Sequence, residues 1–397
     1  MPGLTTVEIS RIDGEATGYG TFQSHNQKVV SNRNGIFATH IRSRNEAYTA
    51  QQWRLSRSVD GGATFTTLYE ATHATNPPVL ETDAEGNIYL MRVDFVDGNA
   101  YLYRFAAADD YSEPAITTVP RGAAGKYSMF LDREREQLYL FSHNNTFHIV
   151  GRDGAVKRSY DLLQHGEDAL LQYPLLDMDG DVLHAAWTTQ RHGIYLYWDI
   201  HHMLSRDGGE TWESMDGESL QIPVTADQHG RADGIVLDDE YEVHTWLSSF
   251  VARFGKLHFL YMAQHQPARQ HYMRYDVQSG ERERHIWPQF EGEEISLLNL
   301  DGLLATRAEA PDAPLYCVSS HGGRIACLVS YDDGETWRDY AISAEIYRPY
   351  AIGGCRAVTA DGYVIGTFVN QDGAASNSGD DYEVLFFKIR AGLGTRE

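Results

Sequence analysis

Several segments of the chain begin with basic, imidazole or phenol side chains, the residue types that could do chemistry. Each segment opens with polar residues, continues with two to four apolar ones, passes a short turn carrying Gly or Asp, and then alternates like a strand. His and Tyr can act as general base or acid, and Lys or Arg can neutralise a bound anion. The candidate catalytic residues at these starts are His25, Tyr127, Tyr173 and Arg356.

Side chains suited to holding a polar ligand occur beside them. The chain contains only five lysines against 28 arginines, and Lys28 and Lys126 both fall at the repeated position. Each of these residues, taken alone, could instead be an ordinary packed strand residue with no role in binding or catalysis. The candidate substrate-binding residues are Asn26, Lys28, Asn76, Arg92, Lys126, Gln172, Arg191 and Trp246.

The segments that carry these residues predict one architecture. In a β-propeller the innermost strand of every blade enters from the same face, so the residues that open it meet in a central funnel. We therefore expect an all-β fold, a single seven-bladed β-propeller over residues 1–397. Six blades are the alternative, because the sixth copy of the segment is weak. The seven copies begin at His25, Asn76, Lys126, Gln172, Thr245, Glu293 and Gly354.

A second pattern, Ser-x-Asp-x-Gly-x-Thr-aromatic, occurs three times, at 58–65, 205–212 and 330–337. The Asp can accept hydrogen bonds from a turn backbone, the Gly tolerates a positive φ, Ser and Thr close local hydrogen bonds, and the aromatic ring packs beneath. These Asp-box turns are expected on the outside of blades. They support the fold and indicate little about the chemistry.

With these turns the chain resembles the Asp-box β-propellers, the sialidases and their relatives. Other segments are similar to one branch of them, the ulvan lyases and related seven-bladed enzymes that cleave rhamnosyl-glucuronate. Segment 76–89 is similar to that family's His-Asn-Asn-x-x-x-x-x-Asp-x-x-Gly segment, and Gln172-Tyr173-Pro174 to its Thr-Tyr-Pro segment, which supplies a site tyrosine. Segment 186–223 is similar to its strand, Asp-box and Asp-Gly-x-x-Leu-x-x-Pro stretch. The resemblance implies cleavage of a uronate-containing sugar.

The chain also departs from that family. Thr75 stands about where the family has its substrate-facing His, and Arg191 is the nearest candidate for the arginine expected after Tyr-Pro. The Phe-Arg-Ile-Pro sequence that opens most sialidases is missing. These departures leave the exact reaction open.

Charge and composition exclude some classes of partner. The formal net charge of −23 argues against nucleic acid and anionic membrane surfaces, so an anionic ligand would need a local basic patch. The N-terminus has no signal-peptide pattern and no apolar stretch could span a bilayer, which predicts a cytoplasmic protein, although a secreted chain trimmed of its signal would look the same. Cys317, Cys327 and Cys355 form no C-x-x-C pair and are expected to be free, buried thiols. The sequence does not indicate an oligomeric state.

Metal-ligand templates are poorly matched. His201 and His202 would point to opposite faces of a strand, and the spacing of His265 and His271 fits no template. The sequence predicts no required cofactor and leaves a structural calcium or zinc ion open.

Three hypotheses for function follow. The preferred one is a carbohydrate-active enzyme that cleaves an acidic, uronate-containing oligosaccharide by β-elimination, with His and Tyr as acid–base groups and Arg or Lys neutralising the carboxylate. The first alternative is a glycoside hydrolase of the sialidase or rhamnosidase type with paired carboxylates, for which Glu293 and Glu294 are candidates. The second is a non-catalytic propeller that binds glycans or proteins.

Overall fold

The fold was determined as a computed structural model, which describes residues 4–23, 25–43, 51–94, 96–122, 125–142, 144–166, 169–191, 196–226, 235–238, 245–263, 268–295, 302–307, 312–371 and 382–392. These residues form β-strands and one short 3-10 helix, η1 (Ala107–Asp109). Across the same ranges no helix has the length and apolarity needed to cross a bilayer. The all-β prediction is confirmed.

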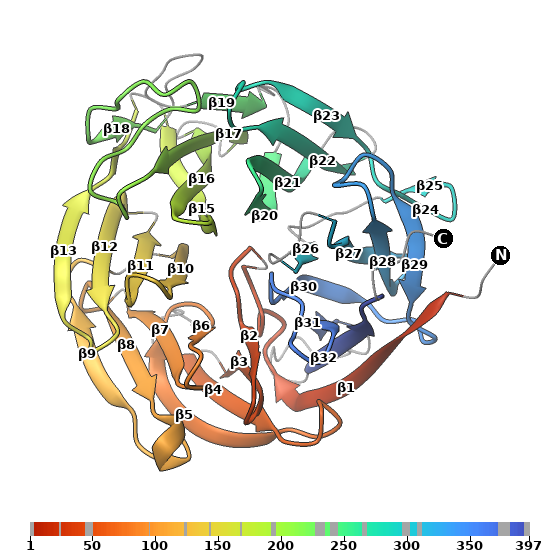
Figure 1. The fold of residues 1–397 in the computed structure, drawn as a ribbon. Helices are drawn as coiled ribbons and strands as arrows, with labels where there is room; N and C mark the ends of the chain where they lie inside the picture. Colours follow the sequence, from red (N-terminus) through yellow and green to blue (C-terminus); the bar gives the residue numbers. More distant parts are fainter. Residues whose placement is uncertain are drawn as a thin grey trace.

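Sheets of four strands surround a common axis, and in each of them one edge strand lies nearest the centre (Figure 1). We number them as blades from the N-terminus and give strands from the inside outward. Blade one contains β2 (Val29–Asn32), β3 (Gly35–Ser43), β4 (Gln51–Ser58) and β5 (Thr66–Ala74). Blade two contains β6 (Val79–Thr82), β7 (Ile88–Asp94), β8 (Asn99–Phe105) and β9 (Ala115–Val119). Blade three contains β10 (Tyr127–Asp132), β11 (Gln137–Ser142), β12 (Thr146–Gly151) and β13 (Val156–Asp161).

The second half of the ring continues in the same way. Blade four contains β15 (Ala169–Asp179), β16 (Val182–Arg191), β17 (Leu196–Ser205) and β19 (Ile235–Asp238). Blade five contains β20 (Thr245–Arg253), β21 (Lys256–Ala263), β22 (Arg269–Asp276) and β23 (Arg282–Ile286). Two small pairs lie outside the blades, β14 (Leu163–Gln164) with β18 (Val224–Thr225), and β24 (Gln289–Phe290) with β25 (Glu293–Glu294).

An eight-stranded sheet closes the ring, and we count it as two blades. Blade six contains β26 (Leu303–Thr306), β27 (Leu315–His321), β28 (Arg324–Ser330) and β29 (Arg338–Ile342). Blade seven contains β30 (Pro349–Gly354), β31 (Tyr363–Asn370), β32 (Tyr382–Arg390) and the N-terminal strand β1 (Thr5–Ala16). Strand β1 runs antiparallel to β32 and also touches β29 in parallel, so the N-terminal strand completes the last blade. Counted in this way, the described part of the chain contains seven four-stranded groups.

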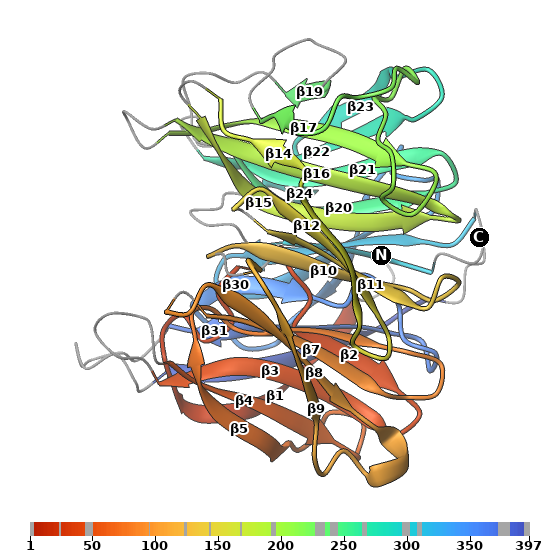
Figure 2. The ribbon, with the colours of Figure 1, turned by 90° about the vertical axis from the view of Figure 1, so that its left-hand side faces the viewer.

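The core lies between neighbouring blades, and both faces of the second strand in a blade are therefore covered. Every residue of β7 and of β11 is buried. One apolar cluster, for example, joins Phe141 and Phe147 of blade three to Leu176 and Trp187 of blade four. Both strands carry a run of apolar residues, 88–91 and 138–141, instead of alternating, as expected where both faces pack. In the side view of Figure 2 the strands cross from one face of the ring to the other.

The three repeated turns form as predicted, each between the third and fourth strands of a blade. In the turn at 330–337, Ser330 Oγ donates to Asp332 Oδ1 (2.8 Å) and accepts from the Gly334 N–H (2.7 Å). Thr336 Oγ1 donates to Asp332 Oδ2 at 2.5 Å. The same set of bonds recurs in the turns at 58–65 and 205–212.

The glycine of each turn packs on an aromatic ring of the preceding blade. A Cβ at Gly334 would lie 1.7 Å from Tyr272 Oη, one at Gly62 2.3 Å from the Phe386 ring, and one at Gly209 2.8 Å from Phe147. All three glycines have positive φ. The repeated turns are therefore contacts between blades as well as hairpin turns.

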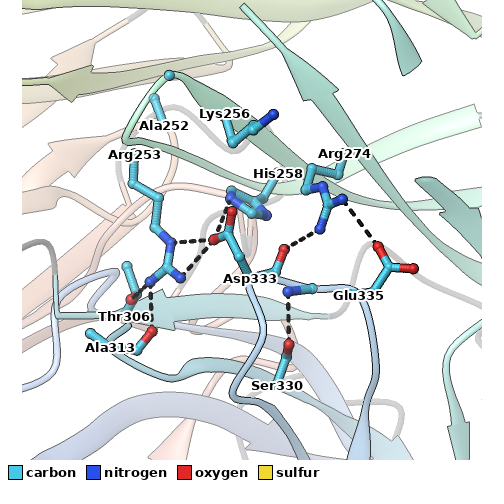
Figure 3. A network of polar contacts seen from close by, with 12 residues as sticks. Ala252, Arg253, Lys256, His258, Arg274, Thr306, Ala313, Ser330, Asp333 and Glu335 are labelled. Atoms are coloured by element: carbon cyan, nitrogen blue, oxygen red, sulfur yellow. Dashed lines mark hydrogen bonds and ion pairs between the residues drawn. The ribbon is translucent and has the colours of Figure 1, made fainter. Parts of the chain in front are cut away.

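At the turn of blade six this contact extends into a polar network with blade five (Figure 3). Arg253 Nε and Nη2 both donate to Asp333 Oδ1, at 2.9 and 2.7 Å. Arg274 Nη1 donates to the Asp333 carbonyl oxygen (2.7 Å), and its Nη2 to Glu335 Oε2 (3.1 Å). His258 Nε2 lies 3.4 Å from Asp333 Oδ1. Blade five thus supplies the basic groups and blade six the carboxylates.

The predicted positions of the sixth and seventh copies need correction. The prediction placed an inner strand at Glu293, but the inner strand of blade six is β26, which begins at Leu303, and Glu293 and Glu294 lie in the small strand β25. In blade seven the inner strand is β30 (Pro349–Gly354), so Arg356 follows that strand and does not open it. The other five inner strands begin within a few residues of the predicted starts.

Candidate functional site

Two predicted catalytic residues meet at the opening ends of the inner strands. The His25 imidazole lies edge-on to the Tyr173 ring, with 5.3 Å between ring centroids. His25 precedes β2 of blade one, whereas Tyr173 lies in β15 of blade four. The fold therefore joins two blades that are far apart in sequence, as the funnel hypothesis requires.

The backbone at Tyr173 explains how its ring reaches this position. The ladder between β15 and β16 is interrupted between Gln172 and Leu175, and Pro174 has no N–H to donate there. Tyr173 has a φ of +48°, which is uncommon for a bulky residue. Such bulges re-aim side chains. Here the bulge brings the Tyr173 ring against His25.

His25 is a buried, neutral base. Its side chain is only 6% exposed, and neither ring nitrogen has a hydrogen-bond partner among the described residues. Burial holds the pKa of His25 well below its usual value, and the nearby charges of Lys28 and Lys126 lower it further. At neutral pH the imidazole is therefore uncharged and keeps a lone pair available for a proton.

Lys126 completes the cluster. Its Nζ lies 4.2 Å from the Tyr173 ring centroid and 5.0 Å from that of Tyr197. It donates to Gln172 Oε1 and lies 3.5 Å from Tyr197 Oη. Burial lowers the pKa of Lys126 to about 7. An anion bound beside Nζ would favour its charged form.

Asn26 and Lys28 hold the segment that carries His25. Lys28 Nζ donates to the Gln23 carbonyl oxygen and to Asn26 Oδ1, and it lies 3.3 Å from the Asn26 carbonyl oxygen. Asn26 Nδ2 donates to the Tyr127 carbonyl oxygen at 3.0 Å. Burial lowers the pKa of Lys28 well below its usual value. These contacts position His25, and they use the donors that were predicted to bind substrate.

A pocket of about 270 Å³ opens beside the cluster. It is lined by Tyr19, Phe22, Ile41, Gln51, Asn76 and Pro77. Phe22 also packs against the pair formed by Tyr173 and Tyr197, so the pocket and the cluster share a wall. Asn76 Nδ2 donates to the carbonyl oxygen of Gly125, the residue before Lys126. The predicted binding residue Asn76 thus lies where the pocket meets the cluster.

Gln172 and Trp246 also lie where they were predicted to lie. Gln172 accepts from Lys126 and donates to Gln190 Oε1 at 2.9 Å. The Trp246 ring packs on Tyr197, with 5.6 Å between centroids. Sequence reasoning missed Tyr197. It is the Cα partner of Gln190 across the β16–β17 ladder, a register that the sequence pattern does not specify.

Arg356 belongs to a deeper cluster with two carboxylates. Its Nη2 bonds to Glu81 Oε1, and its Nε lies 3.7 Å from Asp177 Oδ1. Burial raises the pKa of Asp177 to about 6 and raises that of Glu81. A cavity of about 20 Å³, roughly enough for one water molecule, touches both His25 and Arg356. Arg356 is therefore close to the predicted site but already paired with carboxylates that the sequence did not reveal.

Two candidate residues point elsewhere. Tyr127 is fully buried in an apolar cluster between blades two and three, and its Oη lies 3.1 and 3.2 Å from the carbonyl oxygens of Pro77 and Met91. Arg92 bonds to Asp94 (3.1 Å) and to the His73 carbonyl oxygen, and it stacks on Tyr101. Adjacent strand residues face opposite sides of a sheet, so Tyr127 cannot accompany Lys126 into the funnel. We leave Tyr127 and Arg92 out of the candidate site.

The other residues predicted from the sequence lie outside the candidate site or outside the described residues. The Arg191 side chain and His265 lie outside the described residues. The carboxylate pair is not in the funnel, because Glu293 is exposed on β25 and Glu294 bonds to Arg269 at 2.8 Å. The three cysteines are free and buried, as expected. They are Cys317, Cys327 and Cys355.

Within the described ranges, no group of three or more His, Cys, Asp and Glu side chains is arranged to hold a metal ion. His201 lies 4.0 Å from Asp199, and His202 packs on His184, so the two neighbours do point apart.

Comparison with known proteins identifies the class of fold. No protein-family model and no curated protein matches the sequence. A family PL25 ulvan lyase, solved bound to -[GlcA(1-4)Rha3S]-, superposes with a TM-score of 0.64 at 14% identity, covering 94% of this chain and 95% of that one. The polysaccharide lyase Uly1 gives a TM-score of 0.62 at 10% identity, with coverage of 98% and 100%. An α-L-arabinanase of Penicillium chrysogenum gives 0.50 at 12%, with coverage of 97% and 98%.

At such identities the likeness shows the fold alone. The chain is a β-propeller, and its similarity to the ulvan lyase branch, predicted from segments 76–89 and 172–174, is confirmed at the level of overall structure.

Proposed function

We propose that the protein binds an acidic oligosaccharide at the opening ends of its inner strands and cleaves it by β-elimination beside a uronate. The observation that supports this most is the grouping of Lys126, Tyr173 and His25, a cation, a phenol and a neutral imidazole from three different blades. Elimination needs a group that neutralises the carboxylate, a base and an acid, and these three side chains can fill those roles. The proposal keeps the predicted roles of His25 and Tyr173 and gives the neutralising role to Lys126 in place of Arg356.

In this mechanism Lys126 holds the uronate carboxylate. Its charge withdraws electron density and makes the proton on C5 more acidic. His25, neutral at pH 7 because of its burial, accepts the C5 proton. The C4–O bond then breaks, a C4=C5 double bond forms, and the Tyr173 hydroxyl protonates the leaving oxygen.

The adjoining pocket would take a neighbouring sugar. Tyr19 and Phe22 present aromatic surface there, and their rings contact Tyr350 with centroids 5.8 and 6.4 Å away. Aromatic rings pack well on the apolar face of a sugar, and Gln51 and Asn76 supply amides for its hydroxyls. The fold-level likeness to polysaccharide lyases and an arabinanase raises the expectation of a sugar substrate, but only by analogy.

The test is an assay with glucuronate–rhamnose oligosaccharides such as those of ulvan. Elimination produces an unsaturated uronate that absorbs in the ultraviolet, one for each new reducing end. We expect the ultraviolet absorbance to show one unsaturated uronate for every new reducing end. New reducing ends without that absorbance would overturn elimination, and binding without any new ends would indicate a non-catalytic propeller.

Hydrolysis is the second candidate, favoured by one observation. Glu81 and Asp177 flank the same guanidinium, and burial raises the pKa of both, as a general acid requires. If hydrolysis is the reaction, Asp177→Asn abolishes the release of reducing ends, whereas Lys126→Met leaves it largely intact. Elimination predicts the opposite ranking.

A further inference from the structure

Away from the candidate site, three side chains on blade five direct polar atoms at one point. His271 Nδ1 lies 3.0 Å from His285 Nε2 and 3.1 Å from Tyr261 Oη, and Tyr261 Oη lies 3.1 Å from His285 Nε2. The three residues come from the adjacent strands β21, β22 and β23 (Figure 1). Tyr261 is the Cα partner of His271, and His285 is the partner of Met273, one diagonal step away.

Hydrogen bonding alone does not account for this triangle. An imidazole nitrogen either carries a proton and donates or has a lone pair and accepts, never both. The phenol has a single proton to give. With ordinary two-centre hydrogen bonds, at most two of the three short contacts can be satisfied at the same time, and the third would have to share a proton that is already used. A cation at the common point would use a lone pair of all three atoms.

We propose that Tyr261, His271 and His285 form a site for a divalent transition-metal ion. With metal–ligand distances of about 2.0–2.1 Å, donors 3.0–3.1 Å apart subtend an angle of about 95° at the ion. Tetrahedral zinc needs a wider angle, whereas octahedral and tetragonal ions take right-angled ligands. Imidazole and oxygen donors with this geometry suit Cu²⁺ or Ni²⁺, and Cu²⁺ binds tightest in this series.

The surroundings fit a site that joins strands. Tyr261 and His271 are buried, whereas His285 is exposed on the outermost strand, so water can complete the coordination. The nearby cation Arg269 lies over Trp287 and is paired with Glu294 at 2.8 Å, which reduces its repulsion of a metal ion. The ion would tie β23 to β21 and β22. Binding releases the phenol proton and any imidazolium proton, so affinity falls in acid.

The test uses the full chain after treatment with a chelator. Titration with CuCl₂, followed by calorimetry and absorption spectroscopy, should show one ion per chain and a visible band from phenolate-to-copper charge transfer. Titration with NiCl₂ should give weaker binding at the same stoichiometry. Both ions should raise the melting temperature, because the assembled site binds them more tightly than the unfolded chain does.

Variants assign the site to these residues. His285→Gln changes an exposed residue and should fold normally, yet it should weaken Cu²⁺ binding by more than the roughly 10–100-fold typical of losing an outer-shell partner. Tyr261→Phe should abolish the charge-transfer band and leave weaker binding by the two histidines. His73→Asn, an exposed histidine of β5 with a φ of +67° that Asn also adopts, should change neither signal. Equal affinity in wild type and His285→Gln, a band that persists in Tyr261→Phe, or a wild type that binds no ion would overturn the proposal.

Discussion

The two ends of the inner strands differ in what surrounds their buried cations. Strand β20 runs from Trp246, beside the candidate site, to Arg253, in the network of Figure 3. At the Arg253 end a guanidinium that is 1% exposed bonds twice to Asp333. At the opposite end Lys28 bonds to carbonyl and amide oxygens, and Lys126 contacts an amide and two phenol rings.

This difference distinguishes structural charge from functional charge. A buried cation paired with a carboxylate holds blades together. A buried lysine such as Lys28, bonded to carbonyl and amide oxygens, destabilises the fold by its desolvation. Desolvation likewise lowers the pKa of Lys126 to about 7. Such unfavourable arrangements persist where function needs them. The comparison therefore predicts that changes at the Asp333 end affect stability and that changes at the Lys126 end affect activity.

The largest effect is expected at His25. His25→Gln removes the proposed base while keeping a polar side chain of similar reach, so turnover of uronate oligosaccharides should fall by about 10²–10⁴-fold. The variant should melt within a few degrees of wild type. Gln27→Asn, on the same segment but outside the acid–base pair, is the control and should keep most of the activity. Full turnover in His25→Gln would exclude the mechanism.

Gly334→Ala should be the most destabilising change at the other end. Gly334 has a φ of +82°, and an added Cβ would lie 1.7 Å from Tyr272 Oη. The free energy of unfolding should fall by about 3 kcal/mol or more, measured by denaturant titration. Gly180→Ala separates the two causes, since Gly180 has a φ of +60° but no atom within 4 Å. The free energy of unfolding of the Gly180→Ala control should fall by only about 1 kcal/mol. Equal losses would mean that the contact between blades contributes nothing.

Asp333→Asn tests the ion pair itself. The amide retains the left-handed backbone and an acceptor but removes the charge facing Arg253, so stability should fall by about 1–3 kcal/mol. Glu335→Gln changes a side chain that is 49% exposed and should cost less than about 1 kcal/mol. Both variants should keep the activity of wild type. A loss of activity without a loss of stability would contradict the assignment of this end as structural.

The turns and most inner strands could be predicted because their signals are local. Ser58–Phe65 and its two counterparts contain every side chain that their hydrogen bonds use. The inner strands from β2 to β20 combine apolar runs with Gly or Asp turns. The inner strand of blade six was misplaced because another apolar run, 295–298, precedes β26 and follows the polar pair Glu293 and Glu294.

The site could be predicted only in part, because it depends on contacts between distant blades. His25 and Tyr173 were predicted from their place at strand openings, and their rings lie in contact. The partners of Arg356 were not visible, since Glu81 and Asp177 lie inside apolar strands of two other blades. Tyr127 was assigned to the funnel because sequence does not specify which face of β10 its ring takes.

Lys126→Met should raise the stability of the fold and lower the activity on acidic substrates. The pKa of Lys126 is about 7 in the folded chain and near 10.5 when unfolded, so between these values only the unfolded chain holds the proton. The stability contributed by this group therefore rises with pH from 7 to 10.5, and its full penalty applies below 7. At pH 7 Lys126→Met should stabilise the fold by about 1–2 kcal/mol and abolish activity on acidic substrates. A destabilised variant would show that Lys126 is structural.

The smallest effect, and the most specific, is the pH dependence of binding. An acidic oligosaccharide should bind the protonated form of Lys126, and that form declines as pH rises through about 7. In the His25→Gln variant, which does not consume substrate, affinity should be roughly tenfold weaker at pH 8 than at pH 6. A neutral oligosaccharide of the same length should bind equally at both values, because no carboxylate meets the lysine. If the acidic ligand also binds equally at both, the cation that receives it is not Lys126, and the contrast between the two ends of the propeller loses its functional meaning.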